Sequence, residues 1–430
     1  MNWKAQIAER GLPERLTISL WDFSWYTRTG PGEPFENLDR AFEEATDRSI
    51  NTVRICAAPV LLFGDHDLDT SALTFTNFGG SYGQGIRWYD VAGPATLDLR
   101  AQLVELFRAA KRHDCHVILT SWEYQQSSSF LDDDRWYRML MAVEPEQRAL
   151  VTATALADMI DFLAEHDLDD RIAFVEVHNE VTYSFLLDDL DGHASSEDTM
   201  RRLEQPLTKA VDILRERHPG IFATVSYARP PIGAMRFVPK NIQVGQFHVY
   251  VYGVVEELIE RLGMRMLGDQ ALDVEAAKRL VLRAGSPAPS DYGPTDDNLW
   301  RLDATWISAG YFYVHDWIDA EKFDRWMYRS YGGYRREMDA RLQIMMSVIA
   351  DYTIEHDIPA VVGEGWLGYT PKDSEFEDGP IGRELDENAM DLARQLGFWG
   401  VVVSSNASPI HSFWKRRDVI DQLNRRFLDA

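Results

Sequence analysis

The sequence predicts a single (β/α)8 barrel over residues 1–430. Short apolar runs rich in β-branched residues recur along the chain, and stretches with a helical apolar period separate them, which is typical of parallel α/β architecture. Eight such runs are present, which is the strand number of a closed barrel. No Gly-x-Gly-x-x-Gly follows the first run, so an open dinucleotide-binding sheet is disfavoured.

The expected strands and helices alternate in order along the chain. The strands are predicted at 16–21, 52–57, 117–122, 172–178, 222–227, 242–249, 360–363 and 400–404. The helices are predicted at 36–48, 96–113, 145–166, 197–218, 335–356, 383–396 and 415–428. Asn37 is suited to cap the first helix, in which Phe42 and Ala45 share one face. The segment between strands five and six has room for only a short helix, so this crossover is abbreviated.

The loops that follow the strands are much longer than those that precede them, above all at 59–94, 123–143 and 253–334. Active sites of barrels lie at this C-terminal rim. The loop 253–334 predicts a lid or cap subdomain inserted after strand six, with helices near 254–267 and 273–284. It also carries an aromatic stretch formed by Trp300, Trp306, Tyr311, Phe312, Tyr313 and Trp317.

Charge and composition restrict the partners that the protein can have. The formal net charge is −25, so the average field repels nucleic acid phosphates and anionic membranes, and neither is expected as a partner. No stretch reaches the roughly 18 apolar residues of a membrane span, and the first residues lack the apolar core of a signal peptide. Cys56 falls inside a predicted strand and Cys115 lies just before one, and both are expected as buried thiols. We expect a cytoplasmic protein, with its oligomeric state left open.

Two glutamates stand where predicted strands end. Glu180 closes the run Ile-Ala-Phe-Val-Glu-Val-His-Asn-Glu, and Glu364 lies in Ala-Val-Val-Gly-Glu-Gly-Trp. Two carboxyl groups that meet at the rim of a barrel can divide the acid and nucleophile roles of glycoside hydrolysis. Asn179 can contact a sugar 2-hydroxyl beside Glu180 only if the backbone bends there, because successive strand residues face opposite sides.

These motifs resemble those of the clan A glycoside hydrolases, the 4/7 retaining barrel enzymes that include the cellulase-like family. Strand four ends in Asn-Glu, strand seven ends in Glu, an Arg lies on strand two and His-x-Tyr lies on strand six. The resemblance covers about 16–250 and 335–410, but not the insertion at 253–334. It implies that Glu180 is the acid/base and Glu364 the nucleophile. The supporting residues that it implies are Asn179 for the 2-hydroxyl, Arg54 and Tyr250 for the nucleophile, and His248 for substrate or acid/base contact.

Other rim residues are candidates for holding sugar rings and hydroxyls. Trp122, Trp366 and Trp414 can provide flat apolar faces, while Asp22 and Glu123 can accept hydrogen bonds from hydroxyls. Further rim candidates are Trp21, Trp25, Ser405 and Asn406.

The predicted activity is retaining hydrolysis of short glycosides or oligosaccharides, with exo action favoured by the lid. No cofactor and no metal are expected, and the expected partner is a small carbohydrate. Two alternatives stay open. One is a metal-dependent sugar isomerase or epimerase on the same barrel, with Glu180, His248, Glu364 and an Asp as ligands. The other is a carbohydrate-binding barrel without catalysis. Sugar identity, anomeric configuration and linkage are left open.

Overall fold

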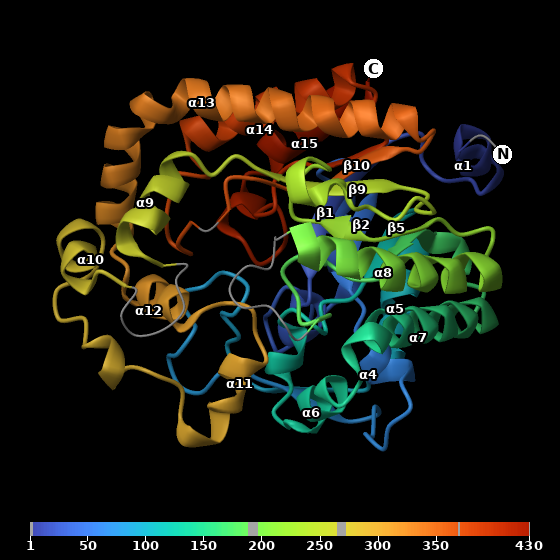
Figure 1. Cartoon of the computed structure of the whole chain (residues 1–430), viewed down its shortest axis with the longest axis horizontal. Helices are drawn as coiled ribbons and strands as arrows, with labels where there is room; N and C mark the ends of the chain where they lie inside the picture. The colour runs from blue at the N-terminus through green and yellow to red at the C-terminus, as the bar shows by residue number, and fades with distance from the viewer. Residues whose placement is uncertain (1–2, 188–196, 265–271, 369, 430) are drawn as a thin grey trace.

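A computed structural model describes residues 3–187, 197–264, 272–368 and 370–429 (Figure 1). In these residues a parallel sheet of nine strand segments has the order β7-β6-β5-β2-β1-β11-β10-β9-β8. The segments are β1 (Leu16–Asp22), β2 (Thr52–Cys56), β5 (His116–Thr120), β6 (Ile172–Glu176), β7 (Ala223–Thr224), β8 (Ser226–Tyr227), β9 (Gly245–Tyr250), β10 (Ala360–Trp366) and β11 (Gly400–Val402).

The sheet closes on itself through the fifth barrel strand. This strand is interrupted at Val225, so that it forms the two short segments β7 and β8. β7 pairs with β6 on one side and β8 pairs with β9 on the other, both in parallel. Counting β7 and β8 as one strand, the nine segments make an eight-stranded barrel, which confirms the predicted fold class.

Helices surround the barrel between its strands. They are α3 (Leu38–Thr46), α5 (Leu99–Arg112), α7 (Pro145–Glu165), α8 (Glu197–Arg217), α13 (Ala320–Glu355), α14 (Pro380–Gln395) and α15 (Arg417–Leu428). The Asn37 side chain accepts a hydrogen bond from the backbone N of Arg40 at 3.0 Å, so the predicted cap of α3 is confirmed. α3 buries Phe42 and Ala45 against the barrel. Shorter helices lie outside this ring, at α1 (Trp3–Glu9), α2 (Ser24–Thr27), α4 (Pro59–Phe63) and α6 (Arg135–Met141), and β3 (Leu73–Phe75) pairs with β4 (Ala95–Leu97) as a two-stranded sheet.

One helix is much longer than its sequence pattern predicts. The helix expected at 335–356 begins at Ala320 and runs unbroken for 36 residues. Asp319 accepts a hydrogen bond from the backbone N of Lys322 at 3.0 Å and so caps the helix at this earlier point. Phe323 and Met327 are buried in the added turns. The helical spacing of apolar residues therefore begins earlier than predicted, inside the stretch that we assigned to the lid.

The segment after β9 contains α9 (Val254–Leu262), α10 (Val274–Leu280), α11 (Trp300–Asp303) and α12 (Ala309–Trp317). α9 ends at Leu262, and positions 265–267 of the helix predicted at 254–267 lie outside the described residues. In Figure 1 α9, α10 and α12 lie at the left, and α11 lies at the bottom, to the left of α6. Arg301 fastens the segment to the barrel loops, because its Nη1 donates to the backbone oxygens of Ser129 at 2.6 Å and Thr76 at 3.2 Å.

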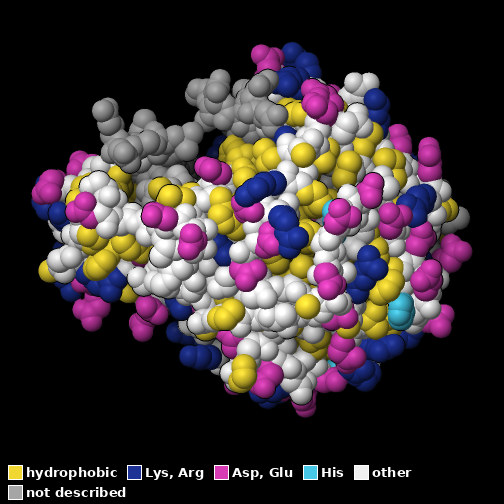
Figure 2. All heavy atoms as spheres, turned by 90° about the horizontal axis from the view of Figure 1, so that it is seen from below, with side chains coloured by type: hydrophobic (Ala, Val, Ile, Leu, Met, Phe, Trp, Pro, Cys, Tyr) yellow, Lys and Arg dark blue, Asp and Glu magenta, His cyan; other side chains and the backbone are white. Residues whose placement is uncertain are grey.

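The described helices include none with the length and apolar character needed to cross a lipid bilayer. Acidic, basic and apolar side chains are interspersed on the face of the molecule shown in Figure 2. Cys56 and Cys115 are both buried and unpaired, as predicted.

Candidate functional site

A cavity of about 1300 Å³ lies at the C-terminal ends of the barrel strands. All eight barrel strands contribute to its wall through their ends or the loops that follow them, namely through Asp22, Trp88, Trp122, Glu180, Ala228, Tyr250, Glu364 and Ser405. The segment after β9 and one face of α13 complete the wall, through Glu256, Leu302, Trp306, Tyr311, Arg341 and Ile344. Small-molecule pockets usually measure roughly 300–1,000 Å³, so this cavity has room for an extended ligand.

Arg54, on β2, is fully buried and joins both sides of the site. Its Nη1 donates to Glu364 Oε1 at 2.8 Å, and its Nη2 donates to Asn179 Oδ1 at 2.6 Å. Its Nε and Nη2 form a bidentate pair with Glu176, both at 2.8 Å. Burial disfavours the charge, but these two carboxylates outweigh burial and raise the pKa of Arg54 above its ordinary value. The guanidinium therefore stays charged and fixes the Glu364 carboxylate.

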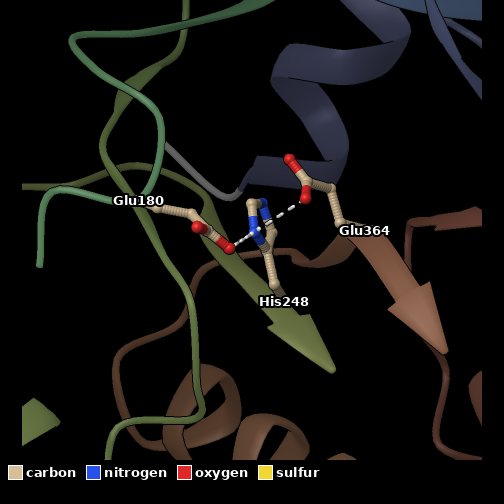
Figure 3. Close-up of side chains that lie close together, drawn as sticks. All are labelled: Glu180, His248 and Glu364. Atoms are coloured by element: carbon tan, nitrogen blue, oxygen red, sulfur yellow. Dashed lines mark hydrogen bonds and ion pairs between the residues drawn. The ribbon is translucent and has the colours of Figure 1, made fainter. Parts of the chain in front are cut away.

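Glu180 and Glu364 face each other across His248 (Figure 3). His248, on β9, lies with its Nδ1 2.8 Å from Glu180 Oε1 and 3.5 Å from Glu364 Oε2. One carboxylate oxygen of each glutamate and one ring nitrogen of His248 all lie within 4.8 Å of one another. The two glutamates predicted from the strand ends thus share one site.

Tyr250 holds the second oxygen of Glu364. The Tyr250 hydroxyl donates to Glu364 Oε2 at 2.9 Å and lies 2.9 Å from Ser405 Oγ. Ser405 Oγ also accepts a hydrogen bond from the backbone N of Gly365 at 2.9 Å. Burial first, and then the charge of Glu364, raises the pKa of Tyr250 well above its ordinary value, so the hydroxyl remains a donor.

The end of strand four bends as the sequence requires. Glu180 has a φ of 39°, a left-handed conformation that is rare for a residue other than glycine. This bend lets Asn179 and Glu180 serve the same site, although they are neighbours in the chain. Gln125 connects them, because its Oε1 accepts from Asn179 Nδ2 at 2.6 Å and its Nε2 donates to Glu180 Oε2 at 3.2 Å.

Asp22 and Trp122 line the cavity, as expected of rim residues. The Arg54 guanidinium lies over the Trp122 ring, 4.6 Å from its centroid. Asp22 is only 8% exposed. Burial, and to a smaller extent the charge of Glu364, raises the pKa of Asp22 to about 7, while hydrogen bonds from Ser24 oppose this rise.

The structure corrects the expectation for Trp366 and Trp414, because neither lines the cavity. Trp366 is buried and donates its Nε1 to the backbone oxygen of Val403 at 2.9 Å. Trp414 donates its Nε1 to Glu44 at 2.8 Å, and Arg48 lies 4.2 Å from its ring centroid. Neither ring is placed to hold a sugar in this cavity.

Some of the other rim candidates line the cavity and others do not. Glu123 accepts hydrogen bonds from Leu61 N at 2.9 Å and Ser121 Oγ at 2.7 Å and does not line the cavity. Trp21 and Trp25 are fully buried in the core. Ser405 and Asn406 do line the cavity.

Several residues of the site were not predicted. Glu176 is the last residue of β6, in which every residue is buried. The sequence offered one sign of its role, namely a carboxylate inside an otherwise apolar strand. Such a buried charge needs a partner, which could have pointed to Arg54. Gln125 and Trp306 lie in long loops. Loops have no regular repeat, so the sequence does not indicate which of their side chains face the site.

The wall of the cavity is strongly acidic in the described residues. Its carboxylates number eight, namely Asp22, Glu180, Glu256, Glu257, Glu260, Asp303, Glu337 and Glu364, against the arginines Arg229 and Arg341. Arg341 is itself paired with Glu256 at 2.8 Å and with Glu337 at 2.7 Å. Charges of one sign in a cleft reinforce one another, so the field in this cavity disfavours anionic ligands.

Glu180, His248 and Glu364 are also the residues that could hold a metal ion, since they offer two oxygen donors and one nitrogen donor within 4.8 Å. The donor set fits poorly, because the Arg54 guanidinium lies 2.8 Å from Glu364 Oε1 and would repel a cation bound to that carboxylate.

Known proteins share the fold and the sequence pattern of the chain. A structure from Parabacteroides distasonis, described as a candidate glycoside hydrolase, has a TM-score of 0.66 and 18% identity, and the match covers 96% of this chain and 93% of that one. A GH5_18 protein of Bifidobacterium longum, solved with Manβ1-4GlcNAc, has a TM-score of 0.50 and 11% identity, over 96% of this chain and 79% of that one. No curated protein matches the chain. The model of the sugar-binding cellulase-like family matches residues 18–428, so the chain belongs to the cellulase-like family.

Proposed function

We propose that the protein is a retaining glycoside hydrolase with Glu364 as nucleophile and Glu180 as acid/base. The observation that carries the proposal is the approach of the two carboxylates, because one oxygen of each and one ring nitrogen of His248 all lie within 4.8 Å of one another. Carboxyl groups of retaining enzymes lie about 5–5.5 Å apart, whereas inverting enzymes leave roughly 6.5–9.5 Å for a water molecule. The separation supports retention.

The proposed reaction has two displacements. Glu364 attacks the anomeric carbon as the bond to the leaving oxygen breaks, and that oxygen takes the proton of Glu180. Glu180, now a carboxylate, then removes a proton from water, which attacks the same carbon and releases Glu364. Arg54 and Tyr250 orient Glu364 for the first step, since each donates to a different oxygen of its carboxylate.

We further propose that the substrates are short glycosides or oligosaccharides and that cleavage is exo. Residues of the lid proposed at 253–334 line the cavity together with α13. A cavity covered in this way favours a short ligand, or the end of a chain, over the interior of a long polymer. Efficient random cleavage of a long polysaccharide, with viscosity falling before monosaccharide appears, would contradict exo action.

We also propose a cytoplasmic location, because a reducing compartment suits the buried, unpaired Cys56 and Cys115. Cell fractionation tests this proposal.

A panel of chromogenic glycosides, with the anomeric configuration of the first product read by NMR, tests the reaction. We expect retention of configuration. Glu364→Ala should lose turnover, and azide should restore it with formation of a glycosyl azide of inverted configuration. The paired variant Glu123→Gln alters another buried acid that does not line the cavity and should keep its activity. Undiminished activity of Glu364→Ala would refute the assignment.

The metal-dependent isomerase is a second candidate, since Glu180, His248 and Glu364 place three donor atoms close together. It predicts that a chelator abolishes activity and that one divalent cation restores it, whereas the hydrolase should be indifferent to both. A sugar-binding barrel without catalysis predicts calorimetric binding of glycosides and no turnover over the whole panel.

A further inference from the structure

We propose that Trp306, in the segment inserted after β9, forms the platform for a ring-bearing leaving group, such as the second sugar of a disaccharide. The inference rests on the proposed function, because it assigns the side of the cavity that receives the leaving group. Trp306 lines the cavity and is partly exposed.

The contacts of the two glutamates indicate on which side of the cavity the leaving group lies. Glu364 is held by Arg54 and Tyr250. Glu180 is held on another side by Gln125, whose Nε2 donates to Glu180 Oε2 at 3.2 Å. In the proposed reaction Glu180 protonates the leaving oxygen, so the group attached to that oxygen lies on the Glu180 side.

Trp306 belongs to the Glu180 side. Its backbone N donates to the backbone oxygen of Gln125 at 2.8 Å, so the residue that holds Glu180 also holds Trp306. Tyr183, three residues after Glu180, lies with its ring centroid 6.3 Å from that of Trp306. Tyr183 also lines the cavity.

Within the described part of the chain, the rings of Tyr183 and Phe185 contact Trp306 and support the platform without stacking on it. Phe185 contacts Trp306 edge to face, with centroids 5.5 Å apart and planes at 63°, and the planes of Tyr183 and Trp306 are inclined by 55°. Neither of these rings stacks face to face on the indole. The adjoining backbone is fixed as well, because Ser128 Oγ donates to the oxygen of Ala304 at 3.3 Å.

The chemistry of an indole favours a ring with an apolar face. An indole offers a flat apolar surface and little loss of rotamer freedom, which suits the C–H face of a pyranose. An alcohol without a ring would cover only part of it. The inserted segment thus selects the leaving group, whereas the barrel strands carry the acid and the nucleophile.

The test compares two substrates that share a glycone, namely the glycosyl fluoride and the disaccharide of each hexose that the panel shows to be accepted. Fluoride departs without occupying the leaving-group side and needs no proton from Glu180. Trp306→Ala should lower kcat/KM for the disaccharide by about 10-fold and leave the fluoride within about twofold of wild type. Trp317→Ala is the matched control, because Trp317 lies in the same segment and does not line the cavity.

Equal losses on both substrates, or no loss on the disaccharide, would overturn the inference. If the wild-type protein cleaves no glycoside of the panel, the proposed hydrolase fails, and the platform is then tested by binding of whichever disaccharide the wild type binds. Calorimetry should show that Trp306→Ala weakens binding of the disaccharide about 10-fold and binding of its glycone monosaccharide less than twofold. Equal weakening of the two ligands would refute the platform independently of turnover.

Discussion

Asp22 should contribute to the pH dependence of the stability of the protein, and Asp22→Asn should remove that contribution. Burial first, and then the charge of Glu364, raises the pKa of Asp22 to about 7 from an ordinary value of 3.8. Asn is a conservative replacement here. It tolerates the left-handed conformation at this position, where φ is 42°, and its Oδ1 can keep the hydrogen bond from the Ser24 backbone N, which is 2.6 Å long.

The sign and the size of the effect follow from the two pKa values. Between pH 3.8 and about 7 the folded protein holds a proton on Asp22 that the unfolded chain has lost, so the free energy of unfolding falls as pH rises through this window. The full difference corresponds to about 4 kcal/mol at 1.36 kcal/mol per pH unit. Between pH 5 and pH 8 the wild type should lose about 2–3 kcal/mol relative to Asp22→Asn.

Thermal unfolding followed by tryptophan fluorescence provides the assay. An unfolding entropy of about 2.1 cal/mol/K per residue gives about 0.9 kcal/mol/K for a chain of this length. The change in Tm from pH 5 to pH 8 should therefore be about 3 °C more negative for the wild type than for Asp22→Asn. Asp67→Asn, at an exposed aspartate, should behave like the wild type. Parallel Tm profiles of Asp22→Asn and the wild type would refute the reasoning.

Three further outcomes are expected. Tyr250→Phe removes a donor 2.9 Å from Glu364, and because hydrogen bonds to charged groups contribute about 1.5–3 kcal/mol, kcat should fall roughly 10- to 150-fold; an unchanged kcat would contradict the role of the hydroxyl. Replacing the sugar of an accepted glycoside by its uronic acid should lower kcat/KM at least about 10-fold at low salt and less at about 0.5 M salt, since the cavity wall is acidic; equal rates would argue against a field effect. Trp414→Phe should lower Tm by losing the bond to Glu44 but leave KM unchanged, and a raised KM would place Trp414 in the site after all.

The barrel could be predicted because parallel strands that are buried on both faces read as continuous apolar runs. β5 contains such a run, from Val117 to Leu119, and every residue of this strand is buried. The break at Val225 could not be predicted, since the apolar run from Phe222 to Tyr227 continues through it. The early start of α13 was missed for another reason. Its aromatic residues fit a lid as well as a helix, and only the cap at Asp319 decides between them.

The pair Glu180 and Glu364 could be predicted because the C-terminal ends of barrel strands converge. Trp414 shows where that rule stops. It follows strand eight, but a loop residue can turn toward the rim or away from it, and its ring packs against Glu44 and Arg48. Gln125 was missed because only the folded backbone brings its loop beside Glu180.

Glu176 explains how the site tolerates a change in the charge of Glu364. A buried ion network costs desolvation and is a poor source of stability, so its presence calls for another reason. In the proposed reaction Glu364 becomes a glycosyl ester and loses its negative charge. Without a second partner the Arg54 guanidinium would then be a buried and unpaired cation. The bidentate pair with Glu176 keeps Arg54 paired in both states, so that Arg54 supports Glu364 as nucleophile and as leaving carboxylate without moving.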